Sequence, residues 1–430
     1  MHHFSYRDGL LHAEDVPVST IAEQVGTPCY VYSTATLTRH VRAFTEAFAG
    51  LGAMVCFAMK ANGNTAVLRL VTGLGAGVDV VSGGELALAL AAGAPAERIV
   101  FSGVGKTAAE MTAALQAGVH QINVESEPEL EALDAVAREL GVRAPVAIRI
   151  NPDVDAATHH KITTGKAENK FGIEWTSARR VFRRAMTLEG IALKGIALHI
   201  GSQILDLAPF ESAFLKVRDL VALLRADGVT VERLDLGGGL GVPYRHGDNS
   251  PPPPTAYADV VRRTVGDLGC ALTIEPGRAI AGNAGVLLSR VIYRKDGITR
   301  AFAIVDAAMN DLMRPALYEA EHEIWPVRQA PPDAERGLID VVGPVCETTD
   351  TFARDVSLPP LVAGDLIAFM TAGAYGAVMA NQYNGRPLVP EVLVNGDRFH
   401  VVRRRPTVAE MAALDDLPPW LETGASGTHR

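Results

Sequence analysis

Cysteine is scarce in this sequence of 430 residues, and its four copies follow no pairing pattern. Cys29, Cys56, Cys270 and Cys346 show neither the CxxC spacing of a zinc site nor a disulfide framework, so we expect reduced thiols and no metal site. The sequence also lacks an uninterrupted apolar run of about 18 residues, which argues against a membrane-spanning helix. The polar stretch MHHFSYRDGLLHAEDV contains no apolar secretion core, and we expect a cytoplasmic location.

Positive charge is also in short supply. The formal net charge is −9, and the basic triplet at 403–405 lies near the end of the sequence. A nucleic-acid-binding surface needs a basic patch, so we expect no nucleic-acid partner. The content of 48% hydrophobic and 21% charged residues is typical of a globular protein. A chain of this length exceeds one typical core, which favours two domains.

Short apolar runs alternate with longer amphipathic runs between residues 36 and 285, as in parallel strands joined by helices. The helical runs end in glycine, as in AAEMTAALQAG and PELEALDAVARELG. Eight units of near-uniform length favour a closed (β/α)8 TIM barrel over the alternative, a doubly wound open sheet. The expected strands are MVCFAMK (54–60), GVDVVS (77–82), RIVFSG (98–103), QINVES (121–126), PVAIRIN (145–151), GIALHIG (195–201), RLDLGGG (233–239) and LTIEPG (272–277).

The helical period fades after residue 285. Runs such as VLLSRVIYRK, LIAFMTAG and FHVVRRR predict antiparallel strands separated by turns. The segment PCYVYS at 28–33 precedes the first barrel unit and is itself strand-like. We therefore predict an α/β chain, with a TIM barrel at residues 36–285 and a β-rich domain of residues 286–430 that also takes in residues 1–35.

Several polar residues end the predicted barrel strands, where barrel enzymes build their active sites. Lys60 ends the first strand in FAMKAN, and its apolar neighbours would depress the pKa of its ammonium group, as a Schiff-base lysine requires. His199 ends the sixth strand in HIGSQ, where it could stack on a planar ring while Ser202 reaches a phosphate. Taken singly, a lysine reaching toward water and a structural histidine are the commoner explanations.

Glycine-containing motifs, DLGGGLG and EPGR, follow the seventh and eighth strands. Barrel phosphate sites are frequently formed by these two loops, and bare glycine backbone can approach an anion closely. A tight turn explains the glycines equally well. Glu275 is placed to bond a pyridine nitrogen and hold it protonated, which makes such a ring an electron sink. The alternative is a local ion pair between Glu275 and Arg278.

The β-rich domain carries polar side chains that packing does not require. MNDLMRPALY puts Arg314 and Tyr318 one helical turn apart, able to hold one substrate carboxylate. GPVCETTD puts Cys346 beside Glu347, although a buried thiol is the commoner role of a lone cysteine. GAYGAVMANQYN sets Tyr375 among small residues that let a ligand approach its hydroxyl.

In this order, the motifs resemble those of the diaminopimelate decarboxylases, a family of fold type III, alanine-racemase-like pyridoxal-phosphate enzymes. The resemblance covers roughly residues 5–405 and rests on FAMKAN, DVVSGGEL, HIGSQ, GGGLG, EPGR, MNDLMRPALY, GPVCETTD and GAYG. It implies decarboxylation of meso-2,6-diaminopimelate to L-lysine and CO2, the last step of lysine biosynthesis. It also implies a homodimer whose active sites lie between the barrel of one chain and the β domain of its partner.

The resemblance further implies roles for single residues. Lys60 would carry pyridoxal 5'-phosphate as a Schiff base, His199 would stack on its ring, and Cys346, delivered by the partner chain, would donate a proton after CO2 leaves. The other expected cofactor contacts are Asp79, Ser202, Gly239, Glu275, Pro276, Gly277, Arg278 and Tyr375. The expected substrate contacts are Arg278, Arg314 and Tyr318 at the distal carboxylate, Glu347 at the distal ammonium, and Tyr375.

One departure from the family pattern is visible in GPVCETTD. Thr348 stands in place of the usual serine and Thr349 in place of glycine, which makes the loop less flexible without touching the chemistry. A related decarboxylase acting on ornithine, arginine or carboxynorspermidine remains the alternative, and Arg314 argues against a substrate with a cationic distal end. A non-catalytic regulatory homologue is a further alternative, against which the presence of Lys60 and Cys346 argues.

Overall fold

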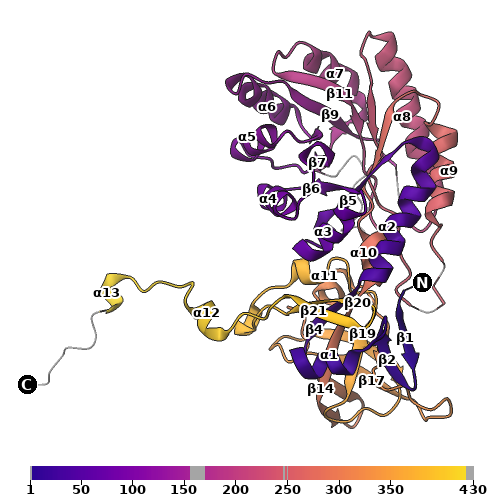
Figure 1. The fold of residues 1–430 in the computed structure, drawn as a ribbon, viewed down its shortest axis with the longest axis vertical. Helices are drawn as coiled ribbons and strands as arrows, with labels where there is room; N and C mark the ends of the chain where they lie inside the picture. The colour runs from indigo at the N-terminus through magenta and orange to yellow at the C-terminus, as the bar shows by residue number, and fades with distance from the viewer. Residues whose placement is uncertain (1, 155–169, 246, 249, 423–430) are drawn as a thin grey trace, which may run out of the picture.

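The structure, a computed structural model, describes residues 2–154, 170–245, 247–248 and 250–422. A barrel of strands and helices lies at one end of the long axis, and a β-sheet domain lies at the other (Figure 1). Beyond the last strand the chain runs away from both domains through two short helices, α12 (Val408–Ala412) and α13 (Pro419–Glu422).

All eight predicted barrel strands are present, and they form a closed parallel sheet. The order runs β9-β11-β12-β13-β5-β6-β7-β8, and pairing of β8 with β9 closes the ring. The prediction of a TIM barrel is therefore confirmed, and the open sheet is excluded. The strands are β5 (Met54–Ala58), β6 (Gly77–Val80), β7 (Ile99–Phe101), β8 (Gln121–Val124), β9 (Ala144–Asn151), β11 (Ile191–Ala197), β12 (Arg233–Asp235) and β13 (Ala271–Ile274), with β10 (Ile173–Glu174) added beside β9.

Helices surround the barrel, and local sequence explains where several begin and end (Figure 1). The side chains of Ser82, Thr107 and Ser126 each accept a hydrogen bond from a backbone N–H of the first helical turn. The predicted glycine stops Gly118 and Gly141 have positive φ. The helices are α2 (Thr34–Phe48), α3 (Thr65–Gly73), α4 (Gly83–Ala91), α5 (Ala108–Ala117), α6 (Glu127–Glu139), α7 (Ala178–Met186), α8 (Ala208–Ala226) and α9 (Pro254–Thr264).

The second domain is a mostly antiparallel sheet, in the order β18-β17-β15-β14-β4-β20-β21, with β19 paired to β14 and β16 paired to β19. The strands are β14 (Gly285–Asp296), β15 (Ala301–Val305), β16 (Ile324–Pro326), β17 (Gly337–Val342), β18 (Thr351–Leu358), β19 (Leu366–Phe369), β20 (Glu391–Asn395) and β21 (Arg398–Arg403). Strands β15 and β17 pair in parallel, and so do β20 and β4. The sequence predicted only antiparallel pairing in this domain.

The N-terminal segment belongs to this second domain. Strand β4 (Cys29–Ser33) lies between β14 and β20, so PCYVYS is a central strand of the sheet. Before it come β1 (Phe4–Arg7), β2 (Leu10–Ala13), β3 (Val16–Pro17) and helix α1 (Val18–Val25), which share a separate apolar core with β4, β14 and β20. We therefore propose the domain limits expected from the sequence, since β4 precedes α2 and β14 follows the barrel.

None of the helices in the described ranges is long and apolar enough to cross a membrane. Within those same ranges, no three His, Cys, Asp or Glu side chains come together as candidate metal ligands.

Candidate active site

A pocket of about 560 Å³ lies where the carboxyl ends of the barrel strands face the β-sheet domain. Both domains contribute, because four of the predicted site residues in the pocket follow barrel strands and three belong to the second domain. The structure thus brings half of the site residues predicted from the sequence into one pocket. The predicted residues that line this pocket are Lys60, His199, Ser202, Arg278, Arg314, Tyr318 and Tyr375.

Lys60 lies in the short helical turn η2 (Met59–Ala61) directly after β5. Its Nζ is 2.9 Å from Oδ2 of Asp79, a fully buried carboxylate of β6. Burial lowers the pKa of Lys60, but the charges of Asp79 and Glu275 outweigh it, and the pKa is raised above its usual value. The predicted depression of this pKa is wrong, because the sequence neighbours of Lys60 are apolar whereas its neighbours in space are acidic.

His199 is a neutral imidazole. Burial, with the charges of Arg149 and Lys60, holds its pKa well below the usual value. Nδ1 accepts a hydrogen bond from the backbone N–H of Gly238 at 3.2 Å, which leaves the proton on Nε2. A neutral ring held at this edge of the barrel, in the pocket with Lys60, can stack on a planar ligand.

Glu275 follows β13 and lies among other buried carboxyl groups. Burial and the charges of Asp235 and Asp79 raise its pKa well above the usual value, and burial raises that of Asp235 to about 6. Oε1 of Glu275 and Oδ1 of Asp79 have no hydrogen-bond partner among the described residues. A protonated pyridine nitrogen would supply both a positive charge and a donor, so these residues fit pyridoxal phosphate.

The glycine motifs are required by close packing of the loops at this end of the barrel. A Cβ on Gly238 would lie 2.1 Å from the carbonyl oxygen of Glu275, and one on Gly239, whose φ is +120°, would lie 2.5 Å from that of Gly201. Gly277 is less tightly constrained, since a Cβ there would lie 3.0 Å from the Cβ of Ala58. The loops therefore need glycine whether or not an anion binds between them.

The ion pair between Glu275 and Arg278, which the sequence left open as the alternative, does not form between these two described residues. Nη2 of Arg278 instead donates to Ser202 Oγ at 3.0 Å, and Nη1 donates to the hydroxyl of Tyr244. The guanidinium also lies over the ring of Tyr375, 4.7 Å from its centroid. Arg278 thus joins the barrel mouth to the second domain.

Arg314 begins α11 (Arg314–Tyr318) and is buried beside Arg278. Burial lowers the pKa of Arg314, and the positive charge of Arg278 acts in the same direction. Its Nε contacts Nε2 of His322 at 3.3 Å, and its guanidinium lies 4.8 Å from the centroid of Tyr244. Neither arginine forms an ion pair with a carboxylate in the described part of the chain, so both are placed to bind an anion.

Tyr244 and His322 are site residues that the sequence did not reveal. Tyr244 contacts both arginines, and burial with the charge of Arg314 lowers the pKa of His322 to about 3, which keeps that ring uncharged beside the guanidinium. The signal for Tyr244 was its position in the loop directly after GGGLG. His322 lies in an irregular segment and offers no such signal.

Cys346 and Glu347 do not line this pocket. The Cys346 residue is exposed, and its backbone N–H donates to Oδ1 of Asn384 at 3.0 Å. The hydroxyl of Tyr383 donates to Glu347 Oε2 at 3.1 Å. Within one chain, the structure therefore separates these two predicted residues from Lys60.

The chain is similar to known pyridoxal-dependent decarboxylases. A family model, "Pyridoxal-dependent decarboxylase, pyridoxal binding domain", matches residues 34–282, more than half of the chain. The diaminopimelate decarboxylase of Pseudomonas aeruginosa is 51% identical over 416 residues, which cover 97% of this chain and 99% of the relative. That of Zymomonas mobilis is 49% identical over 421 residues, with coverage of 97% and 99%.

Solved structures agree with these sequence relatives. The diaminopimelate decarboxylase of M. jannaschii in co-complex with L-lysine has a TM-score of 0.93 and 37% identity, covering 98% of this chain and 100% of that chain. The Helicobacter pylori diaminopimelate decarboxylase complexed with L-lysine has a TM-score of 0.88 and 40% identity, with coverage of 92% and 98%. Matched over nearly its whole length, the chain belongs to the diaminopimelate decarboxylases, a family of pyridoxal-phosphate-dependent enzymes.

Proposed function

We propose that this chain decarboxylates meso-2,6-diaminopimelate to L-lysine and CO2. The observation that carries the proposal is the pair of buried guanidinium groups, Arg278 and Arg314, in the pocket that contains Lys60. A buried cation without a carboxylate partner is costly unless a ligand supplies the negative charge. The distal carboxylate of diaminopimelate would supply it while the other end of the substrate reaches Lys60.

Pyridoxal 5'-phosphate would be held by residues of the barrel mouth. Lys60 would bind it covalently, Asp79 and Glu275 would face its positive charge, and His199 would lie against its ring. Once bound, the cofactor supplies an electron sink that lets the α-carboxylate of the substrate leave as CO2. We propose that the phosphate and its surroundings are held by Ser202, Gly239, Pro276, Gly277, Tyr375 and the backbone of Arg278.

The amino acid itself would be held mainly by the second domain. Arg314 and Tyr318 are neighbours on α11 and both line the pocket, so they would bind the distal carboxylate together with Arg278. Tyr375 would contact cofactor and substrate, since its ring packs on the Arg278 guanidinium. Fixing the distal end orients the α-carboxylate for departure, which adds to kcat as well as to affinity.

We further propose a homodimer with shared active sites. No thiol is found among the described residues that line the pocket of one chain, whereas Cys346 and Glu347 of the same chain are exposed elsewhere on the second domain. In the dimer, the partner's Cys346 would protonate the α-carbon after CO2 leaves, and the partner's Glu347 would bind the distal ammonium. The cytoplasmic location expected from the sequence stays a prediction.

A substrate with a cationic distal end, such as ornithine or arginine, fits the pocket less well. It would bring positive charge toward two buried guanidinium groups, which is unfavourable in a site of low dielectric constant. Glu319 and Glu321 also line the pocket, but both are exposed, and Glu321 already pairs with Arg245. Release of CO2 from a panel of diamino acids and arginine should therefore be fastest with diaminopimelate.

Arg314→Ala should lower kcat/KM for diaminopimelate by roughly 30-fold or more. Loss of one partner from a buried charge-assisted pair costs about 2–5 kcal/mol, and kcat should fall with affinity because the distal contact orients the reacting end. Lysine and ornithine, which lack the distal carboxylate, should lose little from the substitution. The measurement is CO2 release with each substrate in both proteins.

The control for Arg314→Ala is Arg294→Ala, because Arg294 forms a 2.9 Å surface ion pair with Asp296 in the same domain. Surface pairs of this kind contribute about 0–1 kcal/mol, so every activity should stay near that of the parent protein. Equal losses for diaminopimelate and ornithine in Arg314→Ala would indicate general damage to the site. A parent protein that prefers ornithine would remove the substrate assignment while leaving a decarboxylase.

A further inference from the structure

We propose that Asp350 is a positioning residue for the Cys346 thiol, and that it thereby acts on the active site of the neighbouring subunit. The inference rests on the shared-site homodimer proposed above. Asp350 ends the motif GPVCETTD. It is not among the described residues that line the pocket, and it is not one of the residues proposed to bind cofactor or substrate. Only 3% of Asp350 is exposed. Because burial of a carboxylate is costly unless it is hydrogen-bonded, we expect its role to lie in bonds within the fold.

The carboxylate of Asp350 closes the loop that carries Cys346. Its Oδ2 accepts the backbone N–H of Val345, the residue before Cys346, at 2.7 Å. Its Oδ1 accepts the backbone N–H of Met309 at 2.7 Å. At the start of the loop, a Cβ on Gly343 would lie 2.4 Å from Oδ2, so the chain can pass this close to the carboxylate only as glycine. Asp350 therefore fixes the loop both internally and against the segment at 306–311.

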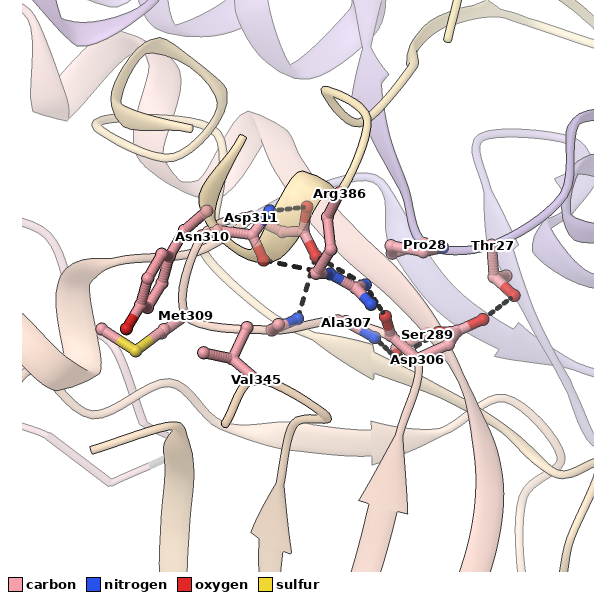
Figure 2. Close-up of polar contacts among 12 residues, drawn as sticks. Thr27, Pro28, Ser289, Asp306, Ala307, Met309, Asn310, Asp311, Val345 and Arg386 are labelled. Carbon is pink, nitrogen blue, oxygen red and sulfur yellow. Dashed lines mark hydrogen bonds and ion pairs between the residues drawn. The ribbon is translucent and has the colours of Figure 1, made fainter. Parts of the chain in front are cut away.

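A second segment, 381–386, also holds this loop. Asn384 accepts the backbone N–H of Cys346, and Tyr383 donates to Glu347. The segment is itself anchored by Arg386, whose Nε donates to Asn310 Oδ1 at 3.1 Å. Figure 2 shows this arginine pointing into the turn formed by residues 306–311, between Asp306 and Asp311.

The supports of the loop and those of the substrate-binding helix α11 are separable. The turn at 306–311 leads into α11, and it keeps its own bonds from the Tyr30 hydroxyl to the Asp311 carbonyl oxygen at 2.6 Å and from the Ala308 N–H to the Asp311 carboxylate at 2.9 Å. Neither bond involves Asp350. Removing the Asp350 carboxylate should therefore displace Cys346, which serves the partner's pocket, more than Arg314, which serves its own.

Mixed dimers test whether Asp350 acts on the partner's pocket rather than on its own. A Lys60→Ala chain paired with a Cys346→Ala chain forms one site that combines native Lys60 from one subunit with native Cys346 from the other. Asp350→Asn is then added to one chain or the other. The amide has one acceptor oxygen in place of two, so at least one of the backbone N–H groups of Val345 and Met309 loses its acceptor.

On the Lys60→Ala chain, which supplies the thiol, Asp350→Asn should lower the restored activity by about tenfold or more, because a misplacement of 1 Å can cost about 10²-fold. On the Cys346→Ala chain, which supplies Lys60 and Arg314, the change should stay below about twofold. Equal losses with either placement would mark Asp350 as a general structural residue and overturn the inference. No activity in the parent mixture, with heterodimers verified, would instead overturn the shared site on which it rests.

A readout other than turnover comes from the thiol itself. In the holoenzyme, L-lysine should slow alkylation of Cys346 by iodoacetamide, followed by mass spectrometry, whereas Asp350→Asn should lose most of this protection at an unchanged cofactor absorbance. Protection equal to that of the parent would contradict the proposal. Asp296→Asn, which changes a 66% exposed carboxylate of the same domain, is the matched control.

Asn384→Gly tests the same loop if Asp350→Asn folds poorly. Asn384 is exposed, and its φ of +57° suits glycine, so the substitution removes the acceptor of the Cys346 N–H without straining the backbone. It should lower the restored activity severalfold on the thiol-supplying chain only. An equal loss of activity with the substitution on either chain would count against positioning of Cys346 by these hydrogen bonds.

Discussion

Lys60→Ala should abolish decarboxylase activity, with a loss of roughly 10³-fold or more. Lys60 is the lysine among the residues that line the pocket, and its Nζ lies 2.9 Å from the buried carboxylate of Asp79. No neighbouring amine in the described chain is placed to replace it. The substitution should also remove the long-wavelength absorbance of the bound cofactor, which depends on the covalent link. Both CO2 release and the absorbance spectrum are measured on purified protein.

Lys194→Ala is the matched control. Lys194 lies on barrel strand β11 and forms a partly exposed ion pair with Glu232 at 2.9 Å. Exposed pairs contribute about 0–1 kcal/mol, so activity and spectrum should be those of the parent. A Lys60→Ala protein with normal turnover and an unchanged spectrum would overturn the assignment of Lys60. A protein that loses its activity and also its cooperative thermal unfolding would point to misfolding.

The raised pKa of Lys60 has a consequence for how the cofactor is bound. In the free protein the ammonium is paired with Asp79, and an amine must lose its proton before it can attack an aldehyde. A positively charged cofactor ring would take over part of the attraction of Asp79 and Glu275, which would lower the pKa of Lys60 as the ring enters. The acidic surroundings alone favour the charged lysine, and Lys60 would lose its proton more readily only once the cationic ring shares them.

The barrel could be predicted because its strands are buried on both faces. All four residues of β6 and of β8 are buried, so these strands appear in the sequence as short apolar runs between capped helices. In the second domain, β17 and β18 were not predicted. Strand β18, TFARDVSL, alternates buried and exposed positions only partly, and its polar residues hide the strand pattern.

The candidate site was predictable where a residue follows a barrel strand, as Lys60 and His199 do. The pKa values of the site could not be predicted from the sequence. They depend on acidic residues from different strands that meet only in the closed barrel, such as Asp79, Asp235 and Glu275. Tyr244 was missed for a related reason. A tyrosine in a loop has many uses. Its contact with Arg278 joins two separate barrel loops, and its contact with Arg314 appears only once the second domain is packed over the barrel mouth.

Mixing inactive Lys60→Ala with inactive Cys346→Ala should restore activity, up to about a quarter of that of the parent protein. In a symmetric dimer with shared sites, random exchange makes half of the dimers heterodimers, and each contains one site with both native residues. The structural basis is the absence of Cys346 from the pocket of its own chain in the described residues, although Arg314 and Tyr375 of the same domain line it.

The measurement is CO2 release as a function of mixing ratio, with subunit exchange verified by mass spectrometry of differently tagged chains. Activity should be greatest at equal amounts and should vanish for either variant alone, since each homodimer lacks one essential group in both sites. Cys346→Ser is a second variant that lacks the thiol but keeps nearly the same side-chain size, and it should complement Lys60→Ala equally well. Verified heterodimers without activity would show that Lys60 and Cys346 act from one chain, which would require the loop at 343–350 to move into its own pocket.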